Sequence, residues 1–217
     1  MDEHYTRRGP PPSHLVHDAA LARRLASVYA VAMPTRIISR RSAPDLFTIG
    51  HSNRSLAEFI LLLRAHGIGR LIDVRTIPRS RHNPQFNKDA LGRSLRARRI
   101  NYRHMKELGG LRRARKDSLI NAGWRNASFR GYADYKQTEE FDAALAKLIS
   151  IAAKKPAAIM CAEAVPWRCH RSMIADALTV KGFAVRHIMS PAAARLHKLN
   201  PMARIRRGRV VYPRSRR

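Results

Sequence analysis

Short apolar runs alternate along this chain with segments of helical periodicity, and this alternation restricts the possible folds more than any other feature. The strand candidates are residues 46–50, 70–75, 100–105, 156–160 and 183–189. The helix candidates are residues 55–66, 88–98, a segment that begins at Thr138, and residues 169–181. Strands that alternate with helices form a mostly parallel sheet with helices on both faces. We therefore predict a single α/β domain of about five strands, Rossmann-like or flavodoxin-like.

The chain has 217 residues, which suffices for one domain with a substantial core. We expect residues 1–44 to form a basic arm that is disordered or partly helical, with a short helix over residues 13–32. Residues 45–213 should form the α/β domain, and residues 214–217 a basic tail. Within the domain, residues 107–134 contain four glycines and read as a long irregular stretch, and residues 209–212 read as a short edge strand.

The chain is strongly basic, with 43 Lys+Arg against 15 Asp+Glu and a formal net charge of +28. Residues 70–130 alone hold 17 Lys+Arg and 4 Asp+Glu, interleaved with aromatic and amide side chains. Such a surface favours nucleic acid or a phosphorylated small molecule as partner, with a merely solvated basic face as the alternative. No run of about 18 apolar residues occurs, so we expect no membrane span and no membrane partner. Two cysteines cannot form a disulfide framework, and we expect a cytoplasmic location.

The predicted strands end in polar side chains that carry chemistry. In a parallel sheet, ligands bind beyond the carboxyl ends of the strands. We therefore expect one site at that edge of the sheet. The reactive side chains there are the candidate catalytic residues: Cys161, Glu163, Asp73 and His51.

Residues 161–172 contain both cysteines, a carboxylate, a histidine and two arginines at a predicted strand-to-helix junction. Arginines and a helix N-terminus lower the pKa of a thiol and make it nucleophilic. The alternatives are a buried inert Cys161 and structural ion pairs of Arg171 with Glu163 and of Asp73 with Arg75. The predicted anion- or substrate-binding residues are Asn53, Arg75, Arg79, Arg81, Arg130, Tyr132, Arg168, Cys169, His170, Arg171 and Ser172.

A metal site is a further alternative, because Cys161, Cys169 and His170 are ligand types, as are Glu163 and a distant His51 or His104. The eight-residue step between the cysteines does not match a zinc-finger or zinc-ribbon pattern. The sequence alone therefore assigns no metal and no cofactor.

Several separate segments of the chain form a recognisable set of motifs: Thr48–Ser55, Asp73–Arg75, Pro78–Arg81, Phe86–Asn87, Leu108–Gly110, Phe129–Tyr135, Cys161–Glu163 and Cys169–Arg171. In this order along the chain, these segments resemble the DUF488 family. The match extends from about residue 46 to residue 212. The resemblance implies a compact α/β domain, and it implies little about activity because the family is named for having no established function.

We predict an enzyme or processing factor that acts on a nucleotide-like or nucleic-acid substrate. A nucleic-acid-binding module without catalysis is one alternative. A thiol-dependent phosphatase or sulfurtransferase is another, since the step from Cys161 to Arg168 resembles the anion loops of those enzymes. That loop lacks glycine here and contains Glu163, which makes it a poor phosphate cradle.

Overall fold

The computed structural model describes residues 45–115 and 117–214. The expected basic arm, the helix expected within it, and residues 215–217 of the expected tail lie outside the described residues.

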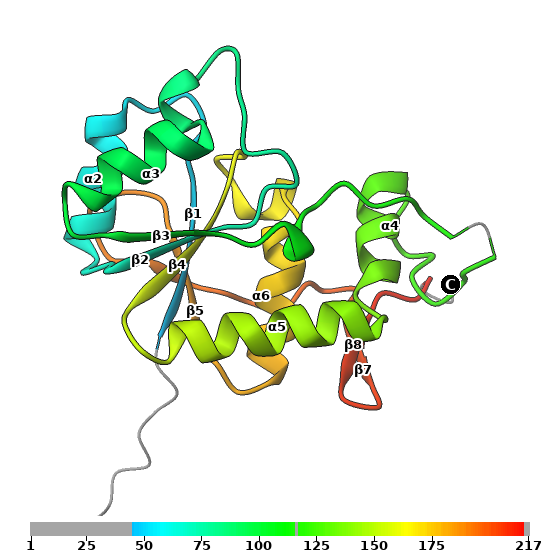
Figure 1. Cartoon of the computed structure of the whole chain (residues 1–217). Coiled ribbons are helices and arrows are strands. Elements are labelled where there is room, and N and C mark those ends of the chain that lie inside the picture. Colours follow the sequence, from blue (N-terminus) through cyan, green and yellow to red (C-terminus); the bar gives the residue numbers. More distant parts are fainter. Residues whose placement is uncertain (1–44, 116, 215–217) are drawn as a thin grey trace, which may run out of the picture. The chain divides into compact units, whose positions relative to one another are not determined.

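A six-stranded sheet forms the centre of the described domain, with strand order β3-β2-β4-β1-β5-β6 (Figure 1). The strands are β1 (Leu46–Gly50), β2 (Arg70–Asp73), β3 (Asn101–His104), β4 (Ala157–Cys161), β5 (Val185–Ile188) and β6 (Arg195–Leu196). The first five strands are parallel, and β6 pairs antiparallel with β5. The predicted α/β class and mostly parallel sheet are confirmed. The additional strand is β6, whose two exposed residues carry no alternating pattern.

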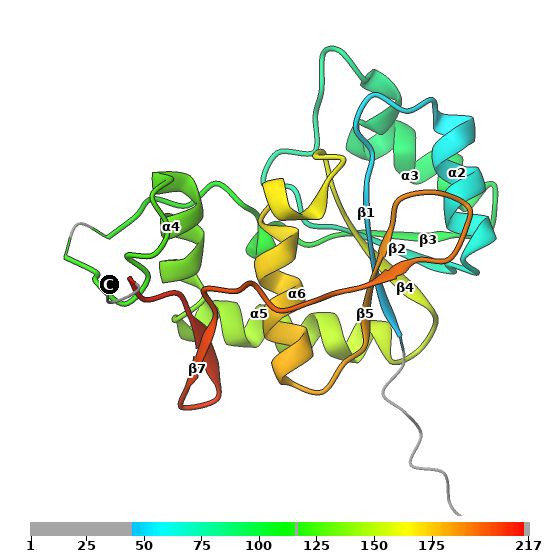
Figure 2. The ribbon, with the colours of Figure 1, turned by 180° about the vertical axis from the view of Figure 1, so that it is seen from behind.

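Helices cover both faces of the sheet, as Figures 1 and 2 show. Helices α2 (Leu56–Ala65) and α3 (Lys88–Arg96) cover one face, and α5 (Glu139–Ala152) and α6 (Arg171–Val180) cover the other. Successive residues of a strand point to opposite faces. In β2, Leu71 accordingly packs with the core of α2 and α3, whereas Ile72 packs with the core of α5 and α6. The predicted sandwich of a sheet between two helical layers therefore has two separate cores.

Helix α4 (Ala127–Tyr135) lies within the stretch that was expected to be irregular, so that expectation was wrong for its last part. The side chain of Asn126 begins the helix by accepting hydrogen bonds from the backbone N–H groups of Ser128 and Phe129. The helix has nine residues, and its buried positions include a glycine and Asp134. An apolar pattern this short and this diluted does not stand out in the sequence.

The segment after the main sheet forms a hairpin of β7 (Arg204–Arg206) and β8 (Arg209–Val211). The predicted strand over residues 209–212 therefore pairs with β7 and not with the main sheet. All three residues of β7 are exposed, which explains why no apolar pattern marks it. Val210, Val211 and Tyr212 are buried, and Val210 and Tyr212 belong to the core that also contains α5 and α6.

Strands β1 and β4 are neighbours, yet the chain leaves them toward opposite faces of the sheet. The loop after β1 leads to α2, and the loop after β4 leads to α6 through a short 3₁₀ helix, η3 (Pro166–Arg168). Two adjacent strands whose helices diverge leave a crevice at their carboxyl ends, where open α/β sheets bind ligands. Among the described residues, no helix has both the length and the apolar character needed to cross a membrane.

Candidate functional site

A cavity of about 720 Å³ opens at this crevice. Its lining comes from the loops after β1, β2 and β4, from α4, from the segment that precedes it, and from the start of α6. A volume of this size is typical of a small-molecule site. The predicted site residues that line it are His51, Asn53, Arg75, Arg79, Tyr132, Cys161, Glu163, Arg168, Cys169 and His170.

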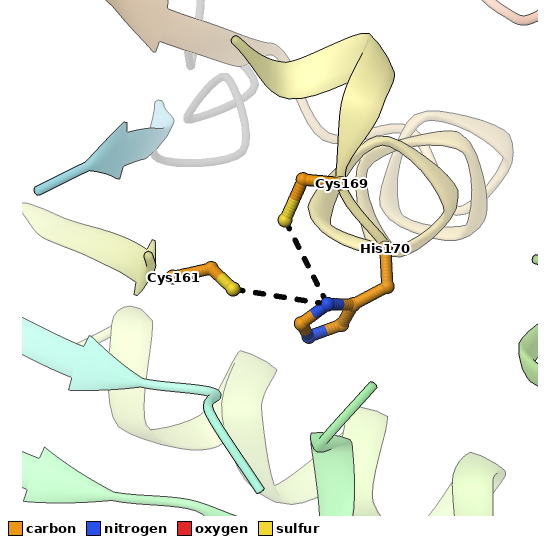
Figure 3. Close-up of side chains that lie close together, drawn as sticks. All are labelled: Cys161, Cys169 and His170. Carbon is orange, nitrogen blue, oxygen red and sulfur yellow. Dashed lines mark hydrogen bonds between the residues drawn. The ribbon is translucent and has the colours of Figure 1, made fainter. Parts of the chain in front are cut away.

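Both cysteines meet His170 at this cavity, and Figure 3 shows the three side chains pointing toward one another. Cys161 ends β4, while Cys169 and His170 immediately precede α6. The Nδ1 atom of His170 lies 3.9 Å from Sγ of Cys161 and 3.7 Å from Sγ of Cys169. Both thiols are free and buried. We refer to these three residues as the Cys–Cys–His cluster.

The orientation of the His170 ring is set by its second nitrogen. Nε2 lies 3.1 Å from the backbone carbonyl oxygen of Val74, which can only accept a hydrogen bond. Nε2 therefore carries a proton, and in the neutral ring Nδ1 presents its lone pair to the two sulfurs. Gly110 lies against the ring, and a Cβ atom there would come within 2.5 Å of Nδ1. The position of His170 thus requires glycine at residue 110.

The two thiols differ in their electrostatics. Burial raises the pKa of Cys169, but its hydrogen bond with Cys161, together with the hydrogen bond and positive charge of a His170 ring protonated at both nitrogens, outweighs burial and holds that pKa well below the ordinary value. The hydrogen bond to Cys169, together with burial, raises the pKa of Cys161. The backbone N–H of Arg171 also donates to Sγ of Cys169, at 3.5 Å. Cys169 is therefore the thiol that carries negative charge more readily.

Asp73 and Arg75 form a buried ion pair at the end of β2. Nη2 of Arg75 lies 2.6 Å from Oδ2 of Asp73, and the Nε and backbone N–H groups of Arg75 donate to Oδ1. The hydroxyl of Tyr102 donates to Oδ2 at 2.7 Å. Asp73 is fully buried and does not line the cavity, whereas Arg75 does. The carboxylate therefore positions Arg75, as the structural alternative had it.

His51 is a neutral residue in this arrangement. Its Nδ1 donates to the backbone carbonyl of Ser52 at 2.8 Å, so its Nε2 accepts from Nη1 of Arg75 at 3.3 Å. The ring stacks on Phe86 with 4.3 Å between centroids. Burial lowers the pKa of His51. Both ring nitrogens are engaged, which leaves His51 as a support for Arg75 at the cavity wall.

Four predicted residues lie outside the cavity lining in addition to Asp73. Arg171 is buried and donates to the backbone carbonyls of Glu163 and Ala164, so it binds the main chain of Glu163 and not its carboxylate. The hydroxyl of Ser172 donates to the carbonyl of Cys169 at 2.9 Å. These two side chains hold the loop between β4 and α6. The other two are Arg81, which is exposed, and Arg130.

Sequence reasoning missed the cavity wall that is formed by the chain segment before α4. Gly110 and Leu111 belong to this wall, and the hydroxyl of Thr76, in the loop after β2, accepts a hydrogen bond from the backbone N–H of Leu111 at 3.0 Å. The signal that marks this wall in the sequence is the glycine pair at 109–110, which appears among the segments that resemble DUF488. No periodic pattern predicts that this segment folds back onto the end of β2.

Comparison with known proteins supports the resemblance. No curated protein and no solved structure matches the chain. The family model described as "Domain of unknown function DUF488" matches residues 55–178, which is more than half of the chain and includes the Cys–Cys–His cluster. The protein therefore belongs to the DUF488 family.

Proposed function

We propose that the protein is an enzyme that binds a phosphorylated, nucleotide-like molecule in this cavity and transforms it at the Cys–Cys–His cluster. The observation that carries the proposal is the meeting of two thiols and an oriented imidazole in a cavity that three arginines also line. Reactive groups beside anion-binding groups at the carboxyl edge of a sheet are typical of an active site.

The cavity suits a phosphate group. Arg75, Arg79 and Arg168 line it, and Glu163 is the one acidic side chain among its described lining residues. Arg79 and Arg168 are exposed, whereas Arg75 is buried and held by Asp73. A guanidinium group binds phosphate oxygens through two parallel hydrogen bonds.

The remaining lining suits a base and a sugar. Ile77 and Leu111 line the cavity although 59% and 70% of their surface is exposed, which leaves apolar area for a planar base. Ser52, Asn53, Ser80 and Asn83 add hydroxyl and amide groups. The cavity volume of about 720 Å³ favours a mononucleotide or a single extruded nucleotide over a nucleic-acid duplex.

Binding is tested by calorimetric titration with the four ribonucleoside monophosphates and with inorganic phosphate. We expect wild-type protein to bind at least one nucleotide, and Arg168→Gln to weaken that binding about 10-fold or more, because a hydrogen bond to a charged group contributes about 1.5–3 kcal/mol. Arg64→Gln is the matched control, since Arg64 is an exposed arginine of α2 outside the cavity lining. Equal affinity of the two variants would place the nucleotide elsewhere.

Catalysis is tested by incubating the nucleotide that binds with wild-type protein and following its mass. We expect conversion by wild type and loss of conversion in Cys169→Ser. A nucleotide that binds but stays unchanged would contradict the enzyme and favour the binding-module alternative. Single-stranded oligonucleotides should then bind with an affinity that falls steeply with salt concentration.

A further inference from the structure

We infer that Cys161, Cys169 and His170 bind a zinc ion whose fourth coordination position is open to the cavity. Thiolate and imidazole groups are the ligands that Zn²⁺ prefers in proteins. The ligand atoms of these three residues all lie within 4.8 Å of one another. Among residues 45–115 and 117–214, no other group of three or more His, Cys, Asp or Glu side chains is placed to hold a metal ion.

The observed distances match those of a tetrahedral zinc site. With Zn–S bonds of about 2.3 Å and Zn–N bonds of about 2.0–2.1 Å, tetrahedral angles separate a sulfur and a nitrogen ligand by about 3.6 Å. The distances from Nδ1 of His170 are 3.9 Å to Sγ of Cys161 and 3.7 Å to Sγ of Cys169. Both separations are within about 0.3 Å of the tetrahedral value, and the two sulfurs lie within 4.8 Å of each other.

The surroundings of the cluster support metal binding as well. Histidine ligands of metals donate their second N–H to a carbonyl or carboxylate oxygen, which fixes the ring. His170 does this through Nε2 and the carbonyl of Val74, so Nδ1 is the atom left for the metal. The backbone N–H of Arg171 donates to Sγ of Cys169, which stabilises a thiolate.

Three protein ligands leave one coordination position for another molecule. Structural zinc sites are closed by four protein ligands, whereas catalytic sites keep an open position for water or substrate. All three residues of the cluster line the cavity, and His51 and Glu163, which also line it, are not part of the ligand group. The inference rests on the proposed function in one respect, since it gives the open position to an oxygen atom of the nucleotide or of water. Zinc binding itself needs no substrate.

The experiment is zinc analysis of the full chain, purified under reducing conditions, with folding checked by circular dichroism. We expect about one zinc ion per chain in wild type. His82→Asn is the matched control for His170→Asn, because His82 is an exposed histidine outside the cavity lining. The control should keep its zinc, while His170→Asn, Cys161→Ser and Cys169→Ser should lose 10-fold or more of their zinc affinity.

Cobalt substitution of wild type provides a second measurement that does not depend on whether a variant folds. We expect a thiolate-to-cobalt charge-transfer band with the intensity of two sulfur ligands, together with strong visible bands of a tetrahedral site. Folded, reduced wild type that binds neither ion, or cobalt bound without the charge-transfer band, would overturn the inference. Zinc bound by a protein that converts no nucleotide would retain the metal site and overturn only the proposed function.

Discussion

The backbone carbonyl of Val74 accepts a hydrogen bond from Nε2 of His170 at 3.1 Å, which joins the end of β2 to the start of α6. The two residues are 96 positions apart in the sequence. Because the acceptor belongs to the main chain, no substitution at Val74 removes it. The orientation of the imidazole therefore depends on the position of the strand end, and the side chains that pack against the ring are the ones that mutation can test.

Gly110→Ala should disrupt the Cys–Cys–His cluster while the fold persists. The added Cβ would lie 2.5 Å from Nδ1 of His170 and 2.9 Å from its Cγ, so the ring has to leave its present position between the two sulfurs and the Val74 carbonyl. We expect the affinity for cobalt, measured by absorption, to fall about 10-fold or more, as it does when the groups that orient a ligand are lost. An unchanged cobalt spectrum would show that the ring is not confined by residue 110.

Gly92→Ala serves as the control for Gly110→Ala and is itself expected to stabilise the protein. Gly92 lies within α3, and a Cβ atom there would meet only the Tyr102 ring, at an ordinary contact distance of 3.5 Å. Replacing a helical glycine by alanine is worth about 0.5–1 kcal/mol, chiefly because the unfolded chain loses conformational freedom. Chemical denaturation should show this gain, and a loss of stability would mean that α3 packs more tightly than described.

Asp73→Asn should destabilise the protein by about 3–5 kcal/mol, because it leaves the buried charge of Arg75 without its counter-charge. The side chains of the pair are 0% and 6% exposed. Asp45→Asn is the comparison, since its ion pair with Arg186 has side chains 44% and 39% exposed and should contribute only about 0–1 kcal/mol. Urea denaturation of both variants measures the difference, and similar losses would contradict the burial argument.

Lys136 is a buried amine outside the cavity, and it should make stability depend on pH. Its Nζ donates to the hydroxyl of Tyr212 at 3.0 Å, and that hydroxyl donates to Oδ2 of Asp176 at 2.6 Å. Burial lowers the pKa of Lys136 to about 7, although the charge of Asp176 opposes the shift. Burial also raises the pKa of Tyr212 above its ordinary value of 10.0.

Between pH 7 and pH 10 the unfolded chain therefore carries a proton on Lys136 that the folded chain has lost. Stability rises with pH wherever the unfolded state binds more protons, so we expect the free energy of unfolding to increase across this window. Above pH 10 the ionisation of Tyr212 in the unfolded chain opposes the gain. Lys136→Met should remove the rise, and Lys147→Met, at a side chain 47% exposed, should keep it. Parallel curves for Lys136→Met and wild type would exclude Lys136 as the cause.

The sequence allowed much of this architecture to be predicted, because strand periodicity and helix caps are local properties. The hydroxyl of Thr138 accepts a hydrogen bond from the backbone N–H of Phe141 at the start of α5, as the sequence indicates. The position of the cavity was predictable as well. The carboxyl ends of β1, β2 and β4 meet there because parallel strands share an edge of the sheet.

The details of the site were less accessible, because they depend on contacts between distant segments. An aspartate at a strand end reads equally well as a base or as the partner of Arg75, and the sequence does not show that Asp73 is buried in an ion pair with Arg75. Similarly, the spacing of Cys161 and Cys169 matches no metal-binding pattern, yet η3 brings the chain back so that both thiols face His170. The wall formed by Gly110 and Leu111 is marked in the sequence only by the glycine pair at 109–110, which does not show where that segment packs.

The packing of Tyr212 beneath α6 has a consequence for biosynthesis. A ribosome delivers the chain from its N-terminal side, and β8 follows every strand of the main sheet. Until residues 210–212 emerge, the core that contains α5 and α6 lacks the buried side chains of Val210 and Tyr212. The Tyr212 hydroxyl that donates to Asp176 is missing as well. We therefore expect the incomplete core of the nascent domain to remain accessible to chaperones and proteases even after the whole parallel sheet has been synthesised.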